Sequence, residues 1–163
     1  MPKHKALPPL AELMDAFEYN SETGVVSHAK TWGKGKKGEE AGSVSVQGYR
    51  QMSFKGQPLR AHRVAWALHY GEDPGSTQID HIDGNKLNNA INNLRLATPK
   101  QNQHNIKAKG YSRRSNGTFQ VRMRVDGKQK YFGHYATEEE AHAAYVKACL
   151  ASRGEFAPAD YLT

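Results

Sequence analysis

The chain has 163 residues, a formal net charge of +7 and a hydrophobic content of only 37%, which suits two small cores better than one large one. Its single cysteine, Cys149, excludes an internal disulfide bond and a zinc site made of four cysteines. The sequence holds neither the roughly 20 consecutive apolar residues of a membrane helix nor the apolar run of a signal peptide, so we expect a cytoplasmic protein with no role at a membrane.

The N-terminal part of the chain predicts short scaffold elements without a catalytic pattern. Apolar residues at helical spacing predict a helix over residues 7–18, with four of them on one side: Leu10, Leu13, Met14 and Phe17. A strand is expected to begin at Val25, and a hairpin with Gln47-Gly48 as its turn is expected over residues 43–54. Residues 60–70 predict a second helix, which Gly71 closes.

Residues 78–108 predict the order strand, loop, strand, helix. A short strand leads into Asp80-His81, and residues 94–97 predict the second strand. Thr98 and Gln101 have the spacing of a capping box, so a helix is expected to begin there and to run to about residue 108.

The C-terminal residues, 110–154, predict a second unit. Apolar and polar side chains alternate from Phe119 to Val125, Asp126-Gly127 is a strong hairpin signal, and a further strand is expected over residues 128–135. Thr137 begins a closing helix with capping-box spacing. The residues of this helix expected to face the sheet are Ala141, Ala144, Tyr145, Ala148 and Ala151. We therefore predict three antiparallel strands backed by one helix.

The whole excess of positive charge lies in one part of the chain. Residues 105–135 hold eight lysines and arginines but one acidic residue, Asp126, whereas basic and acidic residues balance elsewhere. A solvated surface normally mixes the two signs, so this concentration predicts a polyanionic partner. Because the basic segment has the pattern of strands and not of an amphipathic helix, nucleic acid is favoured over an anionic membrane surface.

Asp80, His81 and Asn102 have the chemistry needed to hydrolyse a phosphodiester. The carboxylate of Asp80 and the amide oxygen of Asn102 are hard ligands suited to Mg²⁺ or Mn²⁺, and imidazole is a workable general base near neutral pH. Neighbours on a regular strand point to opposite sides, so Asp80 and His81 can serve one reaction only if the chain bends or the cation lies at the end of the strand. By itself, an Asp-His pair is more often structural than catalytic.

This segment resembles the His-Asn-His (HNH) endonucleases of phages and introns. The matching elements are IDHIDGN at 79–85, NNLR at 92–95 and the QN pair at 101–102. The preceding AHRVAWALHYG, at 61–71, is similar to the helix that those enzymes place before the motif. The resemblance covers roughly residues 15–108. It implies a ββα-metal (His-Me finger) nuclease domain within residues 1–109, with its motif core at 78–108.

The resemblance also implies a role for each motif residue. In that family the first His is the general base, here His81, and the Asp before it is a metal ligand, here Asp80. The central Asn, here Asn93, braces the loop and helps to orient the His. The last ligand falls on Asn102, which makes this sequence an H-N-N variant. His104 is the alternative candidate for that position. Side chains two positions apart on a helix differ in direction by about 200°, so Asn102 and His104 cannot both reach one cation.

Other polar residues near the motif are interpreted as structural. Asn88, Asn89 and Asn92 are typical of turns. His62 is expected to be a histidine whose hydrogen bonds are satisfied within the scaffold. None of these residues is assigned a part in catalysis.

The C-terminal unit, 110–163, resembles the ethylene-response-factor (APETALA-two) DNA-binding domain of plants, which also occurs fused to phage HNH nucleases. The residues that carry the resemblance are GYSRRSNGTFQVRMRVDGKQKYFGHYATEEEAHAAY at 110–145. A sheet of this kind can enter the major groove of DNA. The residues expected to contact DNA are Arg113, Arg114, Gln120, Arg122, Arg124, Lys128, Lys130 and Tyr131. Plant members typically carry Trp on the face toward DNA, where this chain has Tyr131, so their base preference does not transfer.

The sequence thus predicts an α+β protein that cuts double-stranded DNA with a His general base and one divalent cation, Mg²⁺ or Mn²⁺. One active site per chain favours a nick over a double-strand break. We expect a monomer or weak dimer without an obligate protein partner, encoded by a phage or prophage and acting in the bacterial cytoplasm. Two alternatives stay open: a DNA-binding regulator whose nuclease half is a relic, and an RNA-binding module that uses the same basic sheet.

Overall fold

The computed structural model describes residues 6–162, which form two compact units. The first unit ends at Asn102 and the second begins at Gln103. The boundary expected from the sequence lies a few residues further along, between residues 109 and 110. Each unit has its own cluster of buried hydrophobic residues.

The N-terminal helix is shorter than its apolar pattern predicts. Helix α1 spans Leu10–Ala16, and strand β1 (Phe17–Tyr19) follows it and pairs antiparallel with β2 (Val26–His28). Phe17 has extended backbone, and its ring packs edge-on against Trp32 and Phe54 in the core. Met14, also expected to point inward, is 60% exposed. Tertiary packing of the Phe17 ring therefore outweighs the local preference for a longer helix.

Three short strands form the next sheet: β3 (Ser43–Val44), β4 (Arg50–Phe54) and β5 (Gln57–Arg60), antiparallel and in that order. The hairpin expected around Gln47-Gly48 is present with a shorter first strand. The sequence pattern does not predict β5, because Lys55-Gly56 is not a usual hairpin signal and Pro58 is typical of turns and sheet edges. Lys55 and Gly56 both have positive φ, 49° and 75°, as a tight hairpin turn requires.

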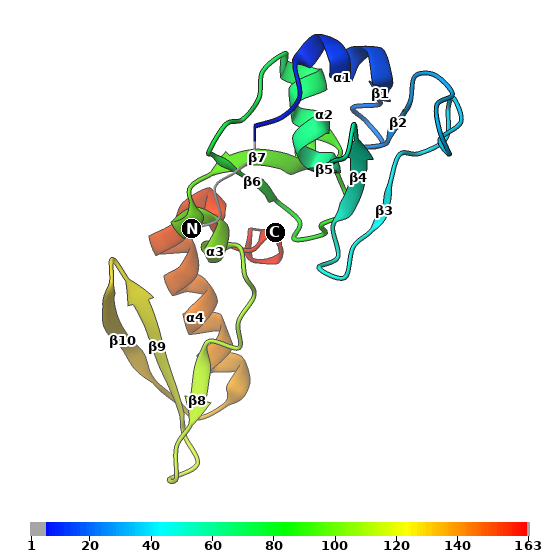
Figure 1. The fold of residues 1–163 in the computed structure, drawn as a ribbon. Coiled ribbons are helices and arrows are strands. Elements are labelled where there is room, and N and C mark those ends of the chain that lie inside the picture. Colours follow the sequence, from blue (N-terminus) through cyan, green and yellow to red (C-terminus); the bar gives the residue numbers. More distant parts are fainter. Residues whose placement is uncertain (1–5, 163) are drawn as a thin grey trace. The chain divides into compact units, whose positions relative to one another are not determined.

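Helix α2 spans Ala61–Tyr70 and packs beside α1 (Figure 1). Val64, Ala65 and Trp66 are buried in the core of the first unit, and Leu68 is half-buried. Gly71 adopts the left-handed backbone conformation with φ 77°, and its N–H donates to the carbonyl of Ala67 at 2.9 Å. The predicted end of this helix is therefore confirmed.

The motif region has the predicted order of elements. Strand β6 (Gln78–His81) pairs antiparallel with β7 (Leu94–Ala97), a 3₁₀ turn η1 (Ile91–Asn93) precedes β7, and helix α3 (Pro99–His104) follows it. The register places Asp80 opposite Arg95 and His81 opposite Leu94.

The capping box at the start of α3 is confirmed, but the helix is shorter than predicted. The N–H of Thr98 donates to Gln101 Oε1 at 2.8 Å, and the N–H of Gln101 donates to Thr98 Oγ1 at 3.2 Å. α3 ends at His104 and not near residue 108. It contains no buried residue, so no apolar face favours a further turn.

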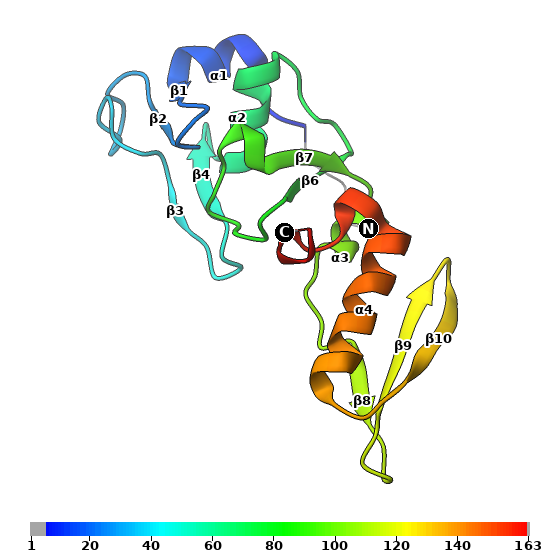
Figure 2. The same ribbon diagram turned by 180° about the vertical axis from the view of Figure 1, so that it is seen from behind.

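The second unit is a three-stranded sheet with one long helix against it. Strands β8 (Tyr111–Arg113), β9 (Phe119–Val125) and β10 (Lys128–Tyr135) are antiparallel, with β9 in the centre. Helix α4 (Glu138–Arg153) runs along one face of this sheet in both views (Figures 1 and 2). Two 3₁₀ turns, η2 (Gly154–Phe156) and η3 (Ala159–Tyr161), follow it.

Helix α4 begins as the sequence predicts and buries a slightly different stripe. Thr137 and Glu140 form the reciprocal capping box. Ala141, Tyr145, Ala148 and Cys149 are buried at the i, i+4, i+7, i+8 spacing of one helix face. Ala151, expected to face the sheet, is exposed because it lies off this stripe, and Cys149 takes the inner position.

Among the residues described, no helix has both the length and the apolar character needed to cross a membrane.

Candidate active site

Asp80 and His81 are the last two residues of β6, and both are 4% exposed. Alternation along the strand sends their side chains to opposite sides. Their partners agree with this, because Asp80 pairs with Arg95 of β7 whereas the ring of His81 packs against His62 of α2. The strand ends at His81, so the two side chains flank the end of the strand, as the sequence analysis required.

Arg95 engages the carboxylate of Asp80 in a largely buried ion pair. Its Nε and Nη2 both donate to Oδ2, at 2.9 and 2.7 Å. Arg95 stands directly opposite Asp80 in the antiparallel pair, where cross-strand side chains lie closest. The sequence analysis did not single out Arg95, although its place between Leu94 and Leu96 on the return strand is the signal that could have found it.

The imidazole of His81 is held by Asn89. His81 Nε2 lies 3.0 Å from Asn89 Oδ1, and Asn89 is itself only 3% exposed. An amide oxygen can only accept, so Nε2 carries the proton and Nδ1 carries the lone pair. Burial, the largest cause, lowers the pKa of His81 below its usual 6.5, although the hydrogen bond to Asn89 acts in the opposite direction. Burial therefore favours a neutral ring near physiological pH, with the proton on Nε2.

The backbone around Asn89 is fixed by the turn between β1 and β2. Tyr19 Oη donates to the carbonyl of Asn89 at 2.8 Å, and the N–H of Ile91 donates to the carbonyl of Ser21 at 2.9 Å. Gly24, with φ +75°, lies so close that a Cβ there would come within 2.3 Å of the nitrogen of Ala90. A residue with a side chain cannot replace this glycine without moving the Asn89 segment.

Tyr49 and His62 complete the surroundings of His81. The ring of His62 meets that of His81 edge-on with centroids 5.2 Å apart, and the ring of Tyr49 lies 6.0 Å from His81. Burial, followed by the charges of His81, Arg63 and Arg60, lowers the pKa of His62 to about 3. His62 is therefore neutral near physiological pH, and its ring packs directly on that of the candidate base.

Asn93 braces the loop that follows His81. Its side-chain NH₂ donates to Asp83 Oδ1 at 2.9 Å and to the carbonyl of Asn88 at 2.8 Å, and its Oδ1 accepts from the N–H of Asp83 at 3.0 Å. Burial acts to raise the pKa of Asp83, but hydrogen bonds from Asn88, Asn85 and Asn93 outweigh it and lower the pKa. Asn93 thus holds the loop in shape, whereas the contact with His81 Nε2 comes from Asn89.

Asn102 lies on the same side of β6 as Asp80. Its side-chain NH₂ donates to Gln78 Oε1 at 2.7 Å, and Gln78 is two residues from Asp80 and so shares its face of the strand. Because the side-chain nitrogen of Asn102 donates to Gln78, its Oδ1 is the atom that could serve as a metal ligand. His104, its rival, belongs to the second unit.

The oxygen atoms of Asp80 and Asn102 have the chemistry that a hard divalent cation prefers, but Arg95 competes with a cation for the Asp80 carboxylate. Carboxylate and amide oxygens are the ligands that Mg²⁺ and Mn²⁺ prefer. Within residues 6–162, no three His, Cys, Asp or Glu side chains gather into a metal-ligating group. A cation here would therefore rely on Asp80 and Asn102, and it would share the Asp80 carboxylate with Arg95.

The register of the second sheet separates the predicted DNA-contacting residues onto two faces. Arg122 stands opposite Tyr131, and Arg124 opposite Gln129, so these four share the outer face, away from α4. Lys128 stands opposite Val125, Lys130 opposite Met123, and Arg113 opposite Phe119, which are residues of the inner face. Arg113, Lys128 and Lys130 are exposed, but they do not share the outer face with Arg122.

Three of the residues predicted to contact DNA differ in exposure and position: Gln120, Arg114 and Tyr131. Gln120 belongs to the outer face by alternation, but it is 5% exposed, enclosed between its cross-strand neighbours Ser112 and His134. Arg114 lies in the turn between β8 and β9. Tyr131 is 56% exposed, and its hydroxyl lies 2.9 Å from Nδ1 of His134, a residue that the sequence analysis did not single out.

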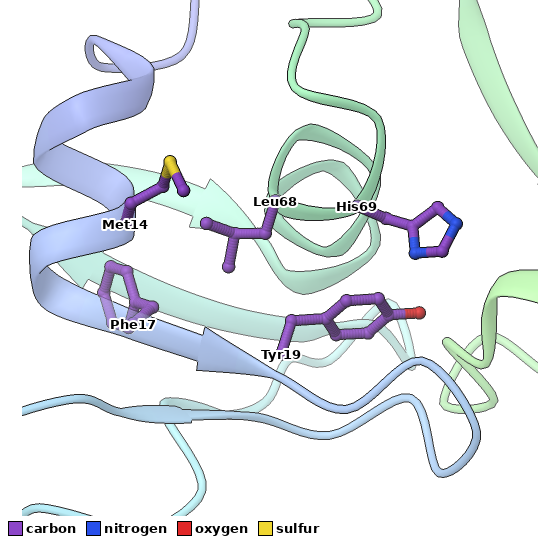
Figure 3. Close-up of a pocket in the computed structure, with 5 residues that line it drawn as sticks. All are labelled: Met14, Phe17, Tyr19, Leu68 and His69. Atoms are coloured by element: carbon purple, nitrogen blue, oxygen red, sulfur yellow. The ribbon is translucent and has the colours of Figure 1, made fainter.

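A shallow groove of about 270 Å³ lies elsewhere on the first unit, and none of the predicted site residues lines it. Figure 3 shows its five side chains, Met14, Phe17, Tyr19, Leu68 and His69, gathered between α1, β1 and α2. Burial, followed by the charge of Tyr70, raises the pKa of Tyr19 to about 12. The Tyr19 hydroxyl stays protonated and donates to the backbone carbonyl of Asn89.

Comparisons with known proteins find matches over the part of the chain that holds Asp80 and His81. Residues 59–104 match the family described as HNH endonuclease. An HNH endonuclease of Acanthamoeba polyphaga mimivirus, described as uncharacterized, is 36% identical over 104 residues, covering 61% of this chain and 56% of that protein. Protein 3.8 of Escherichia phage T7 is 52% identical over 48 residues, covering 29% of this chain and 40% of its own length.

Two further matches carry the name of homing endonucleases. YosQ of Bacillus subtilis, described as an SPbeta prophage-derived putative HNH homing endonuclease, is 33% identical over 96 residues, covering 56% of this chain and 53% of its own length. Among solved structures, one of DNA binding and cleavage by the HNH homing endonuclease I-HmuI matches with a TM-score of 0.41 and 22% identity, covering 85% of this chain and 78% of that one.

The first unit is therefore a mixed α/β domain. More particularly, its residues 59–104, which include Asp80, His81, Asn93 and Asn102, match the HNH endonuclease family. The chain spans about half the length of the first curated relatives that it matches.

Proposed function

We propose that this protein is a metal-dependent DNA endonuclease that hydrolyses a phosphodiester with His81 as general base. The observation that carries the proposal is the state of His81 within the HNH match: a neutral, buried ring at the end of β6, with Nε2 held by Asn89 Oδ1 at 3.0 Å. A base of this kind needs a fixed tautomer and a defined direction for its lone pair.

In the proposed reaction, His81 Nδ1 removes a proton from a water molecule that attacks phosphorus in line with the departing 3′ oxygen. Asn89 keeps the imidazole oriented throughout, and it stabilises the imidazolium once the proton has been taken up, because the Nε2–H bond to its oxygen strengthens with positive charge. Hydrolysis leaves a 5′-phosphate. Asn93 keeps the loop after His81 in shape.

A divalent cation, Mg²⁺ or Mn²⁺, would be held by Asp80 and Asn102. When bound, it would supply positive charge to the scissile phosphate and the departing oxygen. Asp80 and Asn102 offer a carboxylate and an amide oxygen on one side of β6. Arg95 holds the Asp80 carboxylate in a set orientation and must share it with the cation.

The decisive test is cleavage of supercoiled plasmid with Mg²⁺, with Mn²⁺ or with EDTA. We expect the parent protein to cut with either cation and not with EDTA. His81→Ala should cut at least about a hundredfold more slowly, the smallest factor typical of a lost general base. His69→Ala, at an exposed position on the same unit, is the matched control and should cut at the parent rate. Equal rates for His81→Ala and the parent would refute His81 as the base.

We further propose that the second unit binds DNA through the outer face of its sheet, in the manner of the ethylene-response-factor domain that its sequence resembles. Arg122, Arg124 and Tyr131 share this face and are exposed. A sheet with two arginines and an aromatic ring on one open face suits the major groove. Arg113, Arg114, Lys128 and Lys130 are exposed at its margin and would contribute less to binding, whereas buried Gln120 is left out of the set that contacts DNA.

A non-catalytic DNA-binding protein is the second candidate, favoured by the ion pair of Asp80 with Arg95. A carboxylate already satisfied by a guanidinium is what a domain that had lost its metal would keep. The plasmid assay separates the two candidates, since a regulator would bind the plasmid without metal-dependent cutting. Competition between duplex DNA and duplex RNA would separate both from an RNA-binding module.

A further inference from the structure

Two cations from different parts of the first unit lie over the ring of Tyr49. Arg60 Cζ and Lys86 Nζ are each 4.7 Å from its centroid. Arg60 ends β5, Lys86 belongs to the loop that follows His81, and Tyr49 precedes β4. The Tyr49 ring in turn lies 6.0 Å from the ring of His81, so this cluster of three residues adjoins the candidate base.

Neutral groups hold the two cations in place. The side-chain oxygen of Gln47 accepts from Arg60 Nη2, and the backbone carbonyl of Gln47 accepts from Lys86 Nζ at 3.0 Å. The negative face of the Tyr49 ring adds a cation–π attraction to both groups. The two charges are therefore positioned before any ligand arrives, which lowers the entropy cost of binding.

No carboxylate neutralises this pair among the ion pairs of the described residues. Other cations of the same unit behave differently, since Arg50 pairs with Glu40 at 2.7 Å and Lys55 pairs with Glu12 at 2.8 Å. Arg60 and Lys86, held at the Tyr49 ring without a carboxylate partner, create a local positive potential that favours the binding of an anion.

We propose that Arg60, Tyr49 and Lys86 form a phosphate-binding site for the DNA strand that passes His81. The guanidinium and ammonium groups are the usual protein ligands of a phosphodiester, and their place beside the His81 ring fits the backbone of the strand being cut. The inference rests on the proposed function, and it adds a contact with DNA in the first unit, outside the basic segment 105–135.

The test measures binding of the full-length protein to a short DNA duplex of mixed sequence, in EDTA so that no cleavage occurs, as salt is raised from about 50 to 200 mM. We expect Lys86→Gln to weaken binding about fivefold to tenfold at about 0.1 M salt and to lower the slope of log K against log salt by about one. Lys86→Arg, which keeps the charge, should restore the parent slope. Arg60→Gln is the second variant and should behave like Lys86→Gln.

Lys55→Gln is the matched control, because Lys55 also lies over an aromatic ring, that of Phe54, but pairs with Glu12. Its slope should equal that of the parent, and thermal melting should show all variants folded. A slope for Lys86→Gln equal to that for Lys55→Gln would overturn the site, as would tighter binding of duplex RNA than of DNA. Because binding is measured without cleavage, a parent protein that binds but never cuts would refute the proposed endonuclease while leaving the phosphate site intact.

Discussion

The side chain of Asn89 does for His81 what the sequence analysis assigned to Asn93. Asn89 Oδ1 lies 3.0 Å from His81 Nε2, in a setting where both residues are almost fully buried. A buried donor that loses its acceptor costs about 1–3 kcal/mol, so this contact bears on stability as well as on the direction of the ring.

Asn89 should therefore be a positioning residue for the proposed cleavage. Asn89→Ala removes the acceptor, and we expect cleavage to slow by about tenfold to a hundredfold, a range typical of residues that orient a functional side chain. Asn89→Asp keeps an oxygen at the same place and should retain most of the rate that Asn89→Ala loses. Single-turnover cleavage rates give the comparison, and nitrogen NMR of the imidazole reports the tautomer.

Asn92→Ala is the control for Asn89, since Asn92 is exposed in the same run of asparagines. It should cut at the parent rate. Equal losses in Asn89→Ala and Asn89→Asp, or an unchanged His81 tautomer in Asn89→Ala, would contradict the positioning role.

His62 gives a second prediction for a single residue, on stability and pH. Its pKa in the folded protein is about 3 against an ordinary 6.5, chiefly because of burial. Between these values the unfolded chain binds a proton that the folded protein does not, so the free energy of unfolding should fall as the pH drops from 6.5 toward 3. The loss approaches about 1.4 kcal/mol per pH unit for one such group.

Urea unfolding of the parent and of His62→Gln between pH 7 and pH 4 checks this. Glutamine does not titrate, so the fall in the free energy of unfolding should be clearly smaller in the variant. His81 acts in the same direction and keeps part of the slope. Identical slopes in the two proteins would show that His62 is not held neutral by the fold.

At the scale of elements, the register of β9 and β10 decides which cations share a face. Alternation within β9 alone places Arg122 and Arg124 on one face of the sheet and Phe119 and Val121 on the other. Only the pairing with β10, including the shift between Tyr131 and Gly133, shows that Tyr131 joins them while Lys128 and Lys130 do not.

The outer face of the second sheet should therefore dominate DNA binding by that unit. Arg122→Ala combined with Arg124→Ala should lower the salt slope of duplex binding by about two, one for each phosphate contact. Lys128→Ala combined with Lys130→Ala removes the same charge from the same hairpin and should change the slope less. If the lysine pair matters as much as the arginine pair, charge alone and not the face of the sheet governs binding.

At the scale of the whole molecule, the chain divides into two compact units, and the candidate active site lies in the first of them. A single site can break one strand at each encounter. Supercoiled plasmid should therefore pass through the open circle before any linear form appears, at a rate proportional to protein concentration. Direct formation of linear DNA with a rate that rises as the square of concentration would instead indicate two copies acting together.

Much of the motif region follows from the sequence by itself. The order of β6, β7 and α3, the capping boxes of Thr98 and Thr137 and the end of α2 at Gly71 depend on side chains close in sequence. Periodicity and backbone chemistry act over a few residues, so a single sequence contains this information.

The rest depended on contacts between distant segments. Core packing of Phe17 ended α1 early, and the hairpin pairing of β6 with β7 set Arg95 against Asp80. His81 itself was apparent from the sequence, but its acceptor, Asn89, was one asparagine among several until the fold buried it. The sequence by itself therefore determined the choice of Asp80 and His81 as candidates, whereas the groups that hold their side chains were decided by tertiary structure, because burial and cross-strand register exist only once the chain has folded.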